Sequence, residues 1–216
     1  MRKSMAAIIT ISIVVLVTSM LSGNSVYLSN FLKFGVLSTL GELIGVSIKS
    51  RKIRMIDKFF QKVIVWGFIG MLITIAFPLF ISGVEGLQSQ DLLPKFQGNP
   101  LAISFMGSIA MNFTFGPMMM LFHKILDIDL ELNSKVDNRL TVIIQDINWN
   151  SLVKDTWIKT TLCFWIPIHT IVFLLPETIR IIVAAILSTA LGILLSVGDS
   201  KKKASNGKGL INEDVN

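Results

Sequence analysis

The stretch FWIPIHTIVFLLPETIR, residues 164–180, decides how the C-terminal part of this chain is built. It is almost entirely apolar, yet Pro167 removes a backbone donor within it, and a helix interior tolerates that loss poorly. Pro176 suits the first turn of a following helix, where the amide hydrogens have no helical partner in any case. The stretch therefore predicts a short kinked helix, a tight turn and a return helix, which together form a proline-broken hairpin.

Charged and small residues follow the second proline. Glu177 falls in the first turn of the return helix, where a carboxylate complements the helix dipole. Arg180 lies one turn further and must reach water or pair with an acid such as Glu177. We keep Glu177 and Arg180 as candidates for lining a pore or cavity. Small side chains at a spacing of four predict close helix packing on the return helix: Ala184, Ser188 and Gly192.

The composition is that of an integral membrane protein. Only 16% of the 216 residues are charged and 52% are hydrophobic, whereas soluble domains carry about 25% charged residues. Several apolar runs approach the roughly 20 residues that cross a hydrocarbon core. A chain in lipid must satisfy its own backbone hydrogen bonds, so these runs are predicted to be helices. The fold class is therefore all-α, a polytopic transmembrane bundle whose main partner is the lipid bilayer.

Six spans make up a single predicted domain over residues 1–198: Ala6–Leu21, Leu28–Ile48, Val63–Ile81, Leu101–Phe122, Leu162–Leu175 and Ile179–Val197. The first belongs to an extra N-terminal segment, residues 1–27, which is either a retained helix or a cleaved signal peptide; a retained helix is favoured. Residues 199–216 are polar and basic, which predicts a disordered tail.

The basic residues predict the orientation. With six spans and a cytoplasmic N-terminus, only three of the 20 Lys and Arg residues fall outside: Lys33, Lys95 and Arg180. This asymmetry follows the positive-inside rule, so both termini are predicted to lie in the cytoplasm. The predicted location is the plasma membrane. The long loop 124–159 includes the segment INWNSLVKDTWIK, whose apolar residues recur at helical spacing. This segment is either an interfacial helix, which we favour, or a solvated connector.

Three polar residues inside the spans require an explanation. Glu42 is a carboxyl that either lines a pore or cavity or bonds to another helix, and Gly41 and Gly45 beside it predict close helix packing. Asn112 needs a partner on another helix or is a ligand of a solute. His169 is more often a satisfied structural residue than a ligand. Glu42, Asn112 and His169 join the candidates for lining a pore or cavity.

Other chemistry has little support. A single cysteine, Cys163, and two histidines are too few for a thiolate or zinc site, so no metal and no cofactor are expected. No phosphate loop or nucleophile motif appears, and we expect no enzyme and no catalytic residue. The net charge of +6 comes from residues that flank apolar runs, so nucleic acid is not an expected partner.

A set of positions resembles the Mpv17/PMP22 family of small integral membrane proteins. These positions match a GxGD-like block, a G-P…L-D block, W-x-x-L-x-x-D and W-x-P…P-x-x-x-R: Glu42, Gly116, Pro117, Leu126, Asp127, Trp149, Leu152, Asp155, Trp165, Pro167, Pro176 and Arg180. The match covers about residues 35–198 and is densest at 112–198. The family's histidine and tyrosine after G-P fall on Met120 and His123, which implies a divergent, bacterial-type member.

The resemblance implies a compact helical bundle, some of whose relatives are similar to weakly selective channels for small solutes. A channel or permeation protein is therefore the favoured function, and a homo-oligomer is possible. Two alternatives stay open. One is a substrate-binding membrane subunit of a transporter, and the other is a structural or assembly protein that works through its small-residue faces.

Overall fold

The computed structural model describes residues 25–50, 52, 56–132, 136–177 and 179–187. These residues form helices, bends and turns and contain no strand. Four helices are long and apolar enough to cross a membrane: Val26–Ile48, Phe59–Ser89, Pro100–Glu131 and Trp149–Leu174. The all-α class and the apolar spans are confirmed at this level, and they fit a multi-pass membrane protein.

The number of six spans stays a prediction. The first predicted span, Ala6–Leu21, and the tail 199–216 lie outside the described residues. The last predicted span is described as helical only over residues 179–187, so Ser188 and Gly192 also lie outside.

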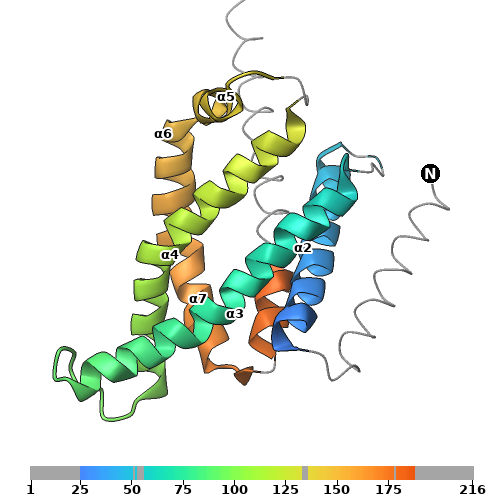
Figure 1. The fold of residues 1–216 in the computed structure, drawn as a ribbon. Helices are drawn as coiled ribbons and strands as arrows, with labels where there is room; N and C mark the ends of the chain where they lie inside the picture. The colour runs from blue at the N-terminus through green and yellow to red at the C-terminus, as the bar shows by residue number, and fades with distance from the viewer. Residues whose placement is uncertain (1–24, 51, 53–55, 133–135, 178, 188–216) are drawn as a thin grey trace, which may run out of the picture.

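The elements follow one another in a simple order. They are α2 (Val26–Ser50), α3 (Phe59–Ser89), α4 (Pro100–Glu131), α5 (Arg139–Asp146), α6 (Trp149–Ser151), η1 (Leu152–Trp165) and α7 (Ile166–Leu174). Figure 1 shows α5 and α6 at one end of the bundle and the turn between α3 and α4, residues 90–99, at the other. We call these the α5–α6 end and the 90–99 end. Under the predicted orientation, the α5–α6 end faces the cytoplasm.

The helices extend beyond the predicted apolar runs because turn residues, and not the last apolar side chain, fix their ends. The Asn99 side chain accepts hydrogen bonds from the amides of Leu101 and Ala102, and Pro100 occupies the first helical position. The 31 residues of α3 span about 46 Å at 1.5 Å per residue, which exceeds a hydrocarbon core of about 30 Å. The helix ends therefore reach the headgroup region.

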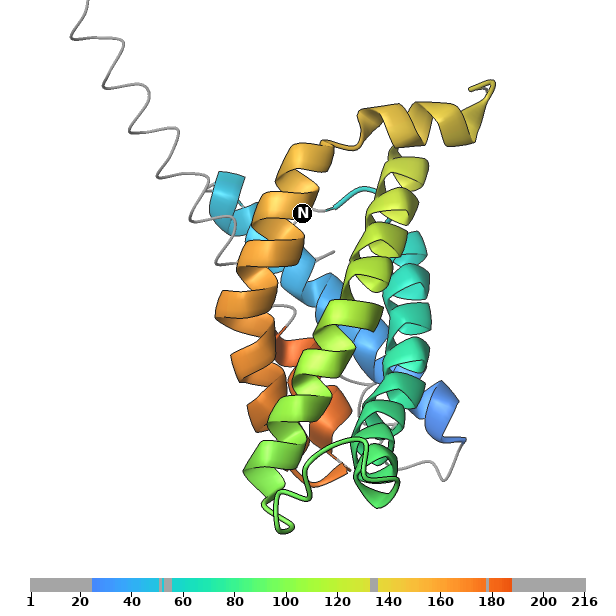
Figure 2. The same cartoon turned by 90° about the vertical axis from the view of Figure 1, so that its left-hand side faces the viewer.

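The fourth described span corrects the prediction for the loop 124–159. A continuous helix runs from Trp149 to Leu174, so the segment 147–159 contains the start of this span and is not a separate interfacial helix, and the predicted start at Leu162 is too late. The element that lies across the end of the bundle is α5, as Figure 2 shows. Ile143 of α5 is buried while Leu140 and Ile144 are exposed, which is the pattern of a helix lying on an interface.

The proline-broken hairpin has a defined turn. Leu175 is extended, with ψ 155°, because a residue before proline is disfavoured in the helical region. The Arg180 side chain crosses the turn and donates to the carbonyls of Phe173 and Leu175, both at 2.8 Å. Arg180 thereby satisfies two of the terminal carbonyls that α7 cannot bond internally. Glu177 is 3.9 Å from Arg180 and is largely exposed.

Glycines allow α2 and α3 to approach closely. A Cβ on Gly35 would lie 2.6 Å from the carbonyl oxygen of Val63, and one on Gly70 would lie 2.4 Å from the Cβ of Phe34. Only hydrogen atoms fit at these two positions, so the backbones meet there. Gly41 and Gly45, the positions predicted for close packing, are buried on the same helix, and Ala184 is buried in the return helix.

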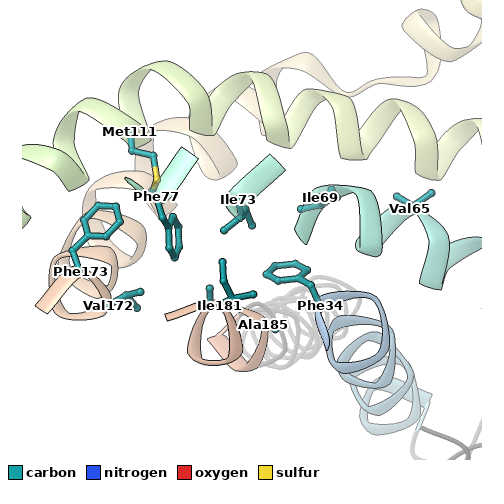
Figure 3. Close-up of a cluster of buried hydrophobic side chains, with 11 residues drawn as sticks. Phe34, Val65, Ile69, Ile73, Phe77, Met111, Val172, Phe173, Ile181 and Ala185 are labelled. Carbon is teal, nitrogen blue, oxygen red and sulfur yellow. The ribbon is translucent and has the colours of Figure 1, made fainter. Parts of the chain in front are cut away.

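An apolar cluster runs through the centre of the bundle. Figure 3 shows its side chains converging from α2, α3, α4, α7 and the return helix, among them Phe34, Ile73, Phe77, Met111, Val172 and Phe173. The rings of Phe77 and Phe173 meet edge to face, with centroids 5.1 Å apart. We call Phe77, Met111, Val172 and Phe173 the apolar plug.

Candidate functional site

A cavity of about 580 Å³ lies inside the bundle. Its walls come from α2, α3, α4, η1 and α7, from Ala184 of the return helix and from the junction of α5 and α6. The cavity residues nearest the α5–α6 end are Asp146, Asn148 and Ser151, and the deepest polar ones are Asn112 and His169. None of residues 78–110 lines it. The cavity therefore occupies the half of the bundle at the α5–α6 end.

Two features of α4 make room for this cavity. Pro117 lies inside α4 and cannot donate the hydrogen bond that an amide at its position would make to Phe113. Figure 1 shows α4 bent in its middle. Gly116 lines the cavity, and a Cβ on it would have no neighbour closer than 3.8 Å. A bend and an absent side chain thus coincide on the wall of the cavity.

A charged cluster lies on the wall of the cavity toward the α5–α6 end. The Lys62 ammonium group of α3 forms ion pairs with Glu42 of α2 and, at 3.1 Å, with Asp127 of α4. The Lys62 side chain is only 12% exposed, and the carboxylates are 26% and 24% exposed. One cation therefore joins three helices, and the two acids together exceed it by one negative charge.

Aromatic rings extend this cluster. The indole nitrogen of Trp66 donates to Glu42 at 3.3 Å. The ring centroids of Trp66 and His123 are 4.2 Å apart. The Nδ1 atom of His123 is 3.6 Å from a carboxylate oxygen of Asp127. The Nε2 atom of His123 is buried and has no hydrogen-bond partner among the described residues. From here on, "charged cluster" means Glu42, Lys62, Trp66, His123 and Asp127.

A second polar group lies deeper, on α4 and α7. The Asn112 amide contacts the Nδ1 atom of His169 at 3.0 Å from its nitrogen and 3.2 Å from its oxygen. The same amide nitrogen donates to the carbonyl of Ser108 at 2.8 Å, and Asn112 is 2% exposed. We call Asn112 and His169 the Asn–His pair. It tightens the contact of two spans and also presents polar atoms to the cavity.

The apolar plug closes the cavity beyond the Asn–His pair. The ring of His169 lies against Phe77 at 5.8 Å and Phe173 at 6.3 Å between centroids. Val172 and Phe173 are 1% and 3% exposed. In this structure, packed hydrocarbon fills the path from the Asn–His pair toward the 90–99 end.

The η1 wall of the cavity has an unusual backbone. Over Leu152–Trp165 the helix is of the π type, and the amide of Ile166 bonds to the carbonyl of Thr161 five residues earlier. Such helices are rare beyond a single turn and concentrate at functional sites. Three buried polar atoms of η1 have no partner among the described residues: Trp157 Nε1, Thr161 Oγ1 and Trp165 Nε1. Of these residues, Trp165 lines the cavity, and its ring stacks on His169 at 5.1 Å.

The structure places the predicted residues in two groups. Glu42, Asn112 and His169 line the cavity, and so do four further residues of the family-like pattern: Gly116, Asp127, Leu152 and Trp165. Glu177 and Arg180 are at the turn near the 90–99 end and are not among the lining residues. The other pattern residues have structural positions. Leu126 packs on the core, Trp149 donates to the carbonyl of Ile144, and Asp155 accepts from Ser151.

Sequence reasoning missed the centre of the charged cluster. From the sequence, Lys62 is one more basic residue flanking an apolar run, but it sits in the first turn of α3, one turn before Trp66. The sequence places His123 only at the end of an apolar run, and its contacts depend on how α3 and α4 cross. Within the described residues, no group of three His, Cys, Asp or Glu side chains is arranged to hold a metal ion.

No protein-family model, curated protein or solved structure matches this chain. The resemblance to the Mpv17/PMP22 family therefore rests on the residues of the sequence pattern alone.

Proposed function

We propose that this chain is an Mpv17/PMP22-type membrane protein through which small solutes permeate. It lies in a plasma membrane with both termini in the cytoplasm, and solutes enter the cavity from the α5–α6 end. The single observation that carries this proposal is the cavity of about 580 Å³ inside a bundle of apolar helices. Clefts of about 300–1,000 Å³ are the usual size of sites for small molecules.

The polar groups on the cavity wall support a role in contacting solutes. Charged residues within spans are costly and mostly face cavities or partners, and Glu42 and Asp127 do both. Glu42 and Asp127 both belong to the family-like pattern and are far apart in the sequence, and both form ion pairs with Lys62. A purely structural ion pair needs one acid, whereas this cluster keeps a second carboxylate at the cavity.

Reconstitution tests the proposal. Purified protein in liposomes is loaded with uncharged polyols of increasing size, and efflux is compared with protein-free liposomes. We expect efflux with a size limit, and a changed rate for Glu42→Gln. Asp91→Asn is the matched control, because this acid pairs with Lys95 in an exposed turn outside the cavity. Efflux equal to protein-free liposomes for every polyol contradicts the proposal.

One observation favours a second candidate, a solute-binding membrane subunit of a transporter. The apolar plug closes the cavity toward the 90–99 end. A cavity closed on one side suits the capture of a solute from the other side better than free passage of the solute through the protein. Saturable binding of a solute by the purified protein, without efflux from liposomes, would select this function over permeation.

A further inference from the structure

We propose that the cavity holds a small amphiphilic amine, with an apolar body in the deep part and an ammonium group at the charged cluster. This inference rests on the proposed function, because it names the class of solute that the same cavity takes. It goes beyond a general permeation role, because it names the chemical class of the solute and the two parts of the cavity that recognise it.

The deep part of the cavity favours an apolar body. Its lining includes three phenylalanines, two methionines and an isoleucine: Phe34, Ile73, Phe77, Met111, Phe115 and Met119. Water is poorly held in a chamber lined by such side chains, because it finds too few hydrogen-bond partners there. An apolar group that replaces this water gains the transfer free energy of its buried surface.

The charged cluster favours a cationic head over an anionic one. Glu42 and Asp127 share one cation, Lys62, so one carboxylate charge is uncompensated. Asp146 and Lys124 also line the cavity and offset each other. The indole of Trp66 belongs to the same cluster and lines the cavity, and an aromatic ring near an ammonium group adds a cation–π attraction. An anionic head would meet the excess negative charge.

The two ends of the cavity are separated by a distance that suits an elongated molecule. Asn112 and Asp127 both line the cavity. At a helical rise of 1.5 Å per residue, these two residues are about 22 Å apart along α4.

Three probes with one elongated skeleton and different charge test this inference: phenyldecylamine, phenyldecanol and phenyldecanoate. Binding to the full chain in nanodiscs is measured by equilibrium dialysis, and empty nanodiscs subtract partition into lipid. We expect saturable binding of the amine at least about tenfold tighter than that of the carboxylate, which corresponds to about one charge-assisted hydrogen bond. The alcohol should fall between the two.

Variants locate the site. Asp127→Asn should reduce amine affinity to the level of the alcohol, while alcohol binding persists and shows that the cavity is intact. Asp91→Asn, an exposed acid outside the cavity, should leave all three affinities unchanged. Gly116→Phe places a ring in the cavity and should abolish binding of every probe, whereas Gly86→Phe, in open space on α3, should not.

The outcomes separate this inference from the proposed function. Equal affinity for the three probes, or tighter binding of the carboxylate, overturns the amine while leaving a solute cavity in place. An amine preference that survives Asp127→Asn and Glu42→Gln overturns the role of the charged cluster. If no probe binds above empty nanodiscs, the amphiphile is wrong, and polyol efflux then decides on permeation independently.

Discussion

The two halves of this bundle use opposite means to join their helices. Toward the α5–α6 end, α2, α3 and α4 meet through one lysine and two acids beside a cavity. Toward the 90–99 end, the apolar plug and the close approach of Gly107 on α4 to Ile81 on α3 bring the helices together. Ion pairs beside a cavity contribute little to holding a membrane bundle together, because the cost of removing the charged groups from water offsets much of the attraction between them.

This difference teaches where function and stability reside. The packed half contains few polar groups that need partners. Its helices are held together by complementary shape, which glycines and aromatic rings supply. The cavity half keeps charged and unpartnered polar groups that packing alone does not need. Variants in the cavity half should therefore change both stability and solute handling, whereas variants in the packed half should change stability alone.

Lys62→Met should have the largest effect on stability. It leaves two carboxylates facing each other without a cation, and we expect a loss of roughly 3 kcal/mol, at the low end for a buried pair because each acid is partly exposed. Thermal unfolding in detergent measures the change. Adding Glu42→Gln and Asp127→Asn to the same chain should recover most of the loss. An unchanged melting temperature for the single variant would show that the ion pairs do not join these helices.

Gly70→Ala tests the close approach of α2 and α3 and should come next. The added Cβ would lie 2.4 Å from the Cβ of Phe34 and 2.9 Å from the carbonyl oxygen of Asn30, so the helices must separate at a cost of about 2 kcal/mol. Gly83→Ala is the matched control on the same helix, because its Cβ would meet nothing within 4 Å. The control should be neutral or slightly stabilising. Equal melting temperatures for both variants would contradict the close approach of α2 and α3.

Arg180→Lys sharpens the contrast at the hairpin turn. A lysine cannot reproduce the forked donation to the carbonyls of Phe173 and Leu175, so we expect a loss of about 1 kcal/mol. Polyol efflux per folded protein should stay the same, because Arg180 does not line the cavity. Lys95→Met removes an exposed ion pair and should have no measurable effect. If Arg180→Lys changes the efflux rate while the folded fraction stays constant, Arg180 contacts the path of the solute, and this prediction is wrong.

Asn112→Ala should have the smallest effect on stability. Hydrogen bonds between spans average about 0.6 kcal/mol, because the unfolded chain in a membrane also finds partners. The variant removes the contact with His169 and widens the cavity, so solute binding should change more than the melting temperature does. A large loss of stability with unaltered binding would assign the Asn–His pair to packing only.

The sequence carried the class of fold and part of the site. Apolar runs with few charges predicted the spans, and Glu42 and Asn112 stood out because a polar residue inside such a run needs a partner. Asp127 and Trp165 were singled out only by their place in a family-like pattern. The grouping of Glu42, Asp127, Trp165 and His169 around one cavity follows from helix crossing, which a pattern does not encode.

Other features lay beyond sequence reasoning for physical reasons. Lys62 stands at a helix start, where a basic residue usually marks a cytoplasmic loop, so its turn toward two acids gave no signal. The π-type backbone of η1 depends on five-residue hydrogen bonds and has no apolar period of its own to reveal it. α5, which lies across the end of the bundle, does have a signal, since Leu140, Ile143, Ile144 and Ile147 follow helical spacing, but the tryptophans of the next segment predict the interfacial helix there instead.

Thiol accessibility tests the one-sided cavity most directly. With Cys163, the sole cysteine of the chain, replaced by serine, Met119→Cys puts a thiol on the cavity wall and Val172→Cys puts one in the apolar plug. A charged, membrane-impermeant thiol reagent is applied to vesicles of opposite sidedness. We expect Met119→Cys to react only from the face that carries the α5–α6 end, and Val172→Cys to react from neither. Reaction of Met119→Cys from the face that carries the 90–99 end, or rapid reaction of Val172→Cys, would contradict a cavity closed by the apolar plug.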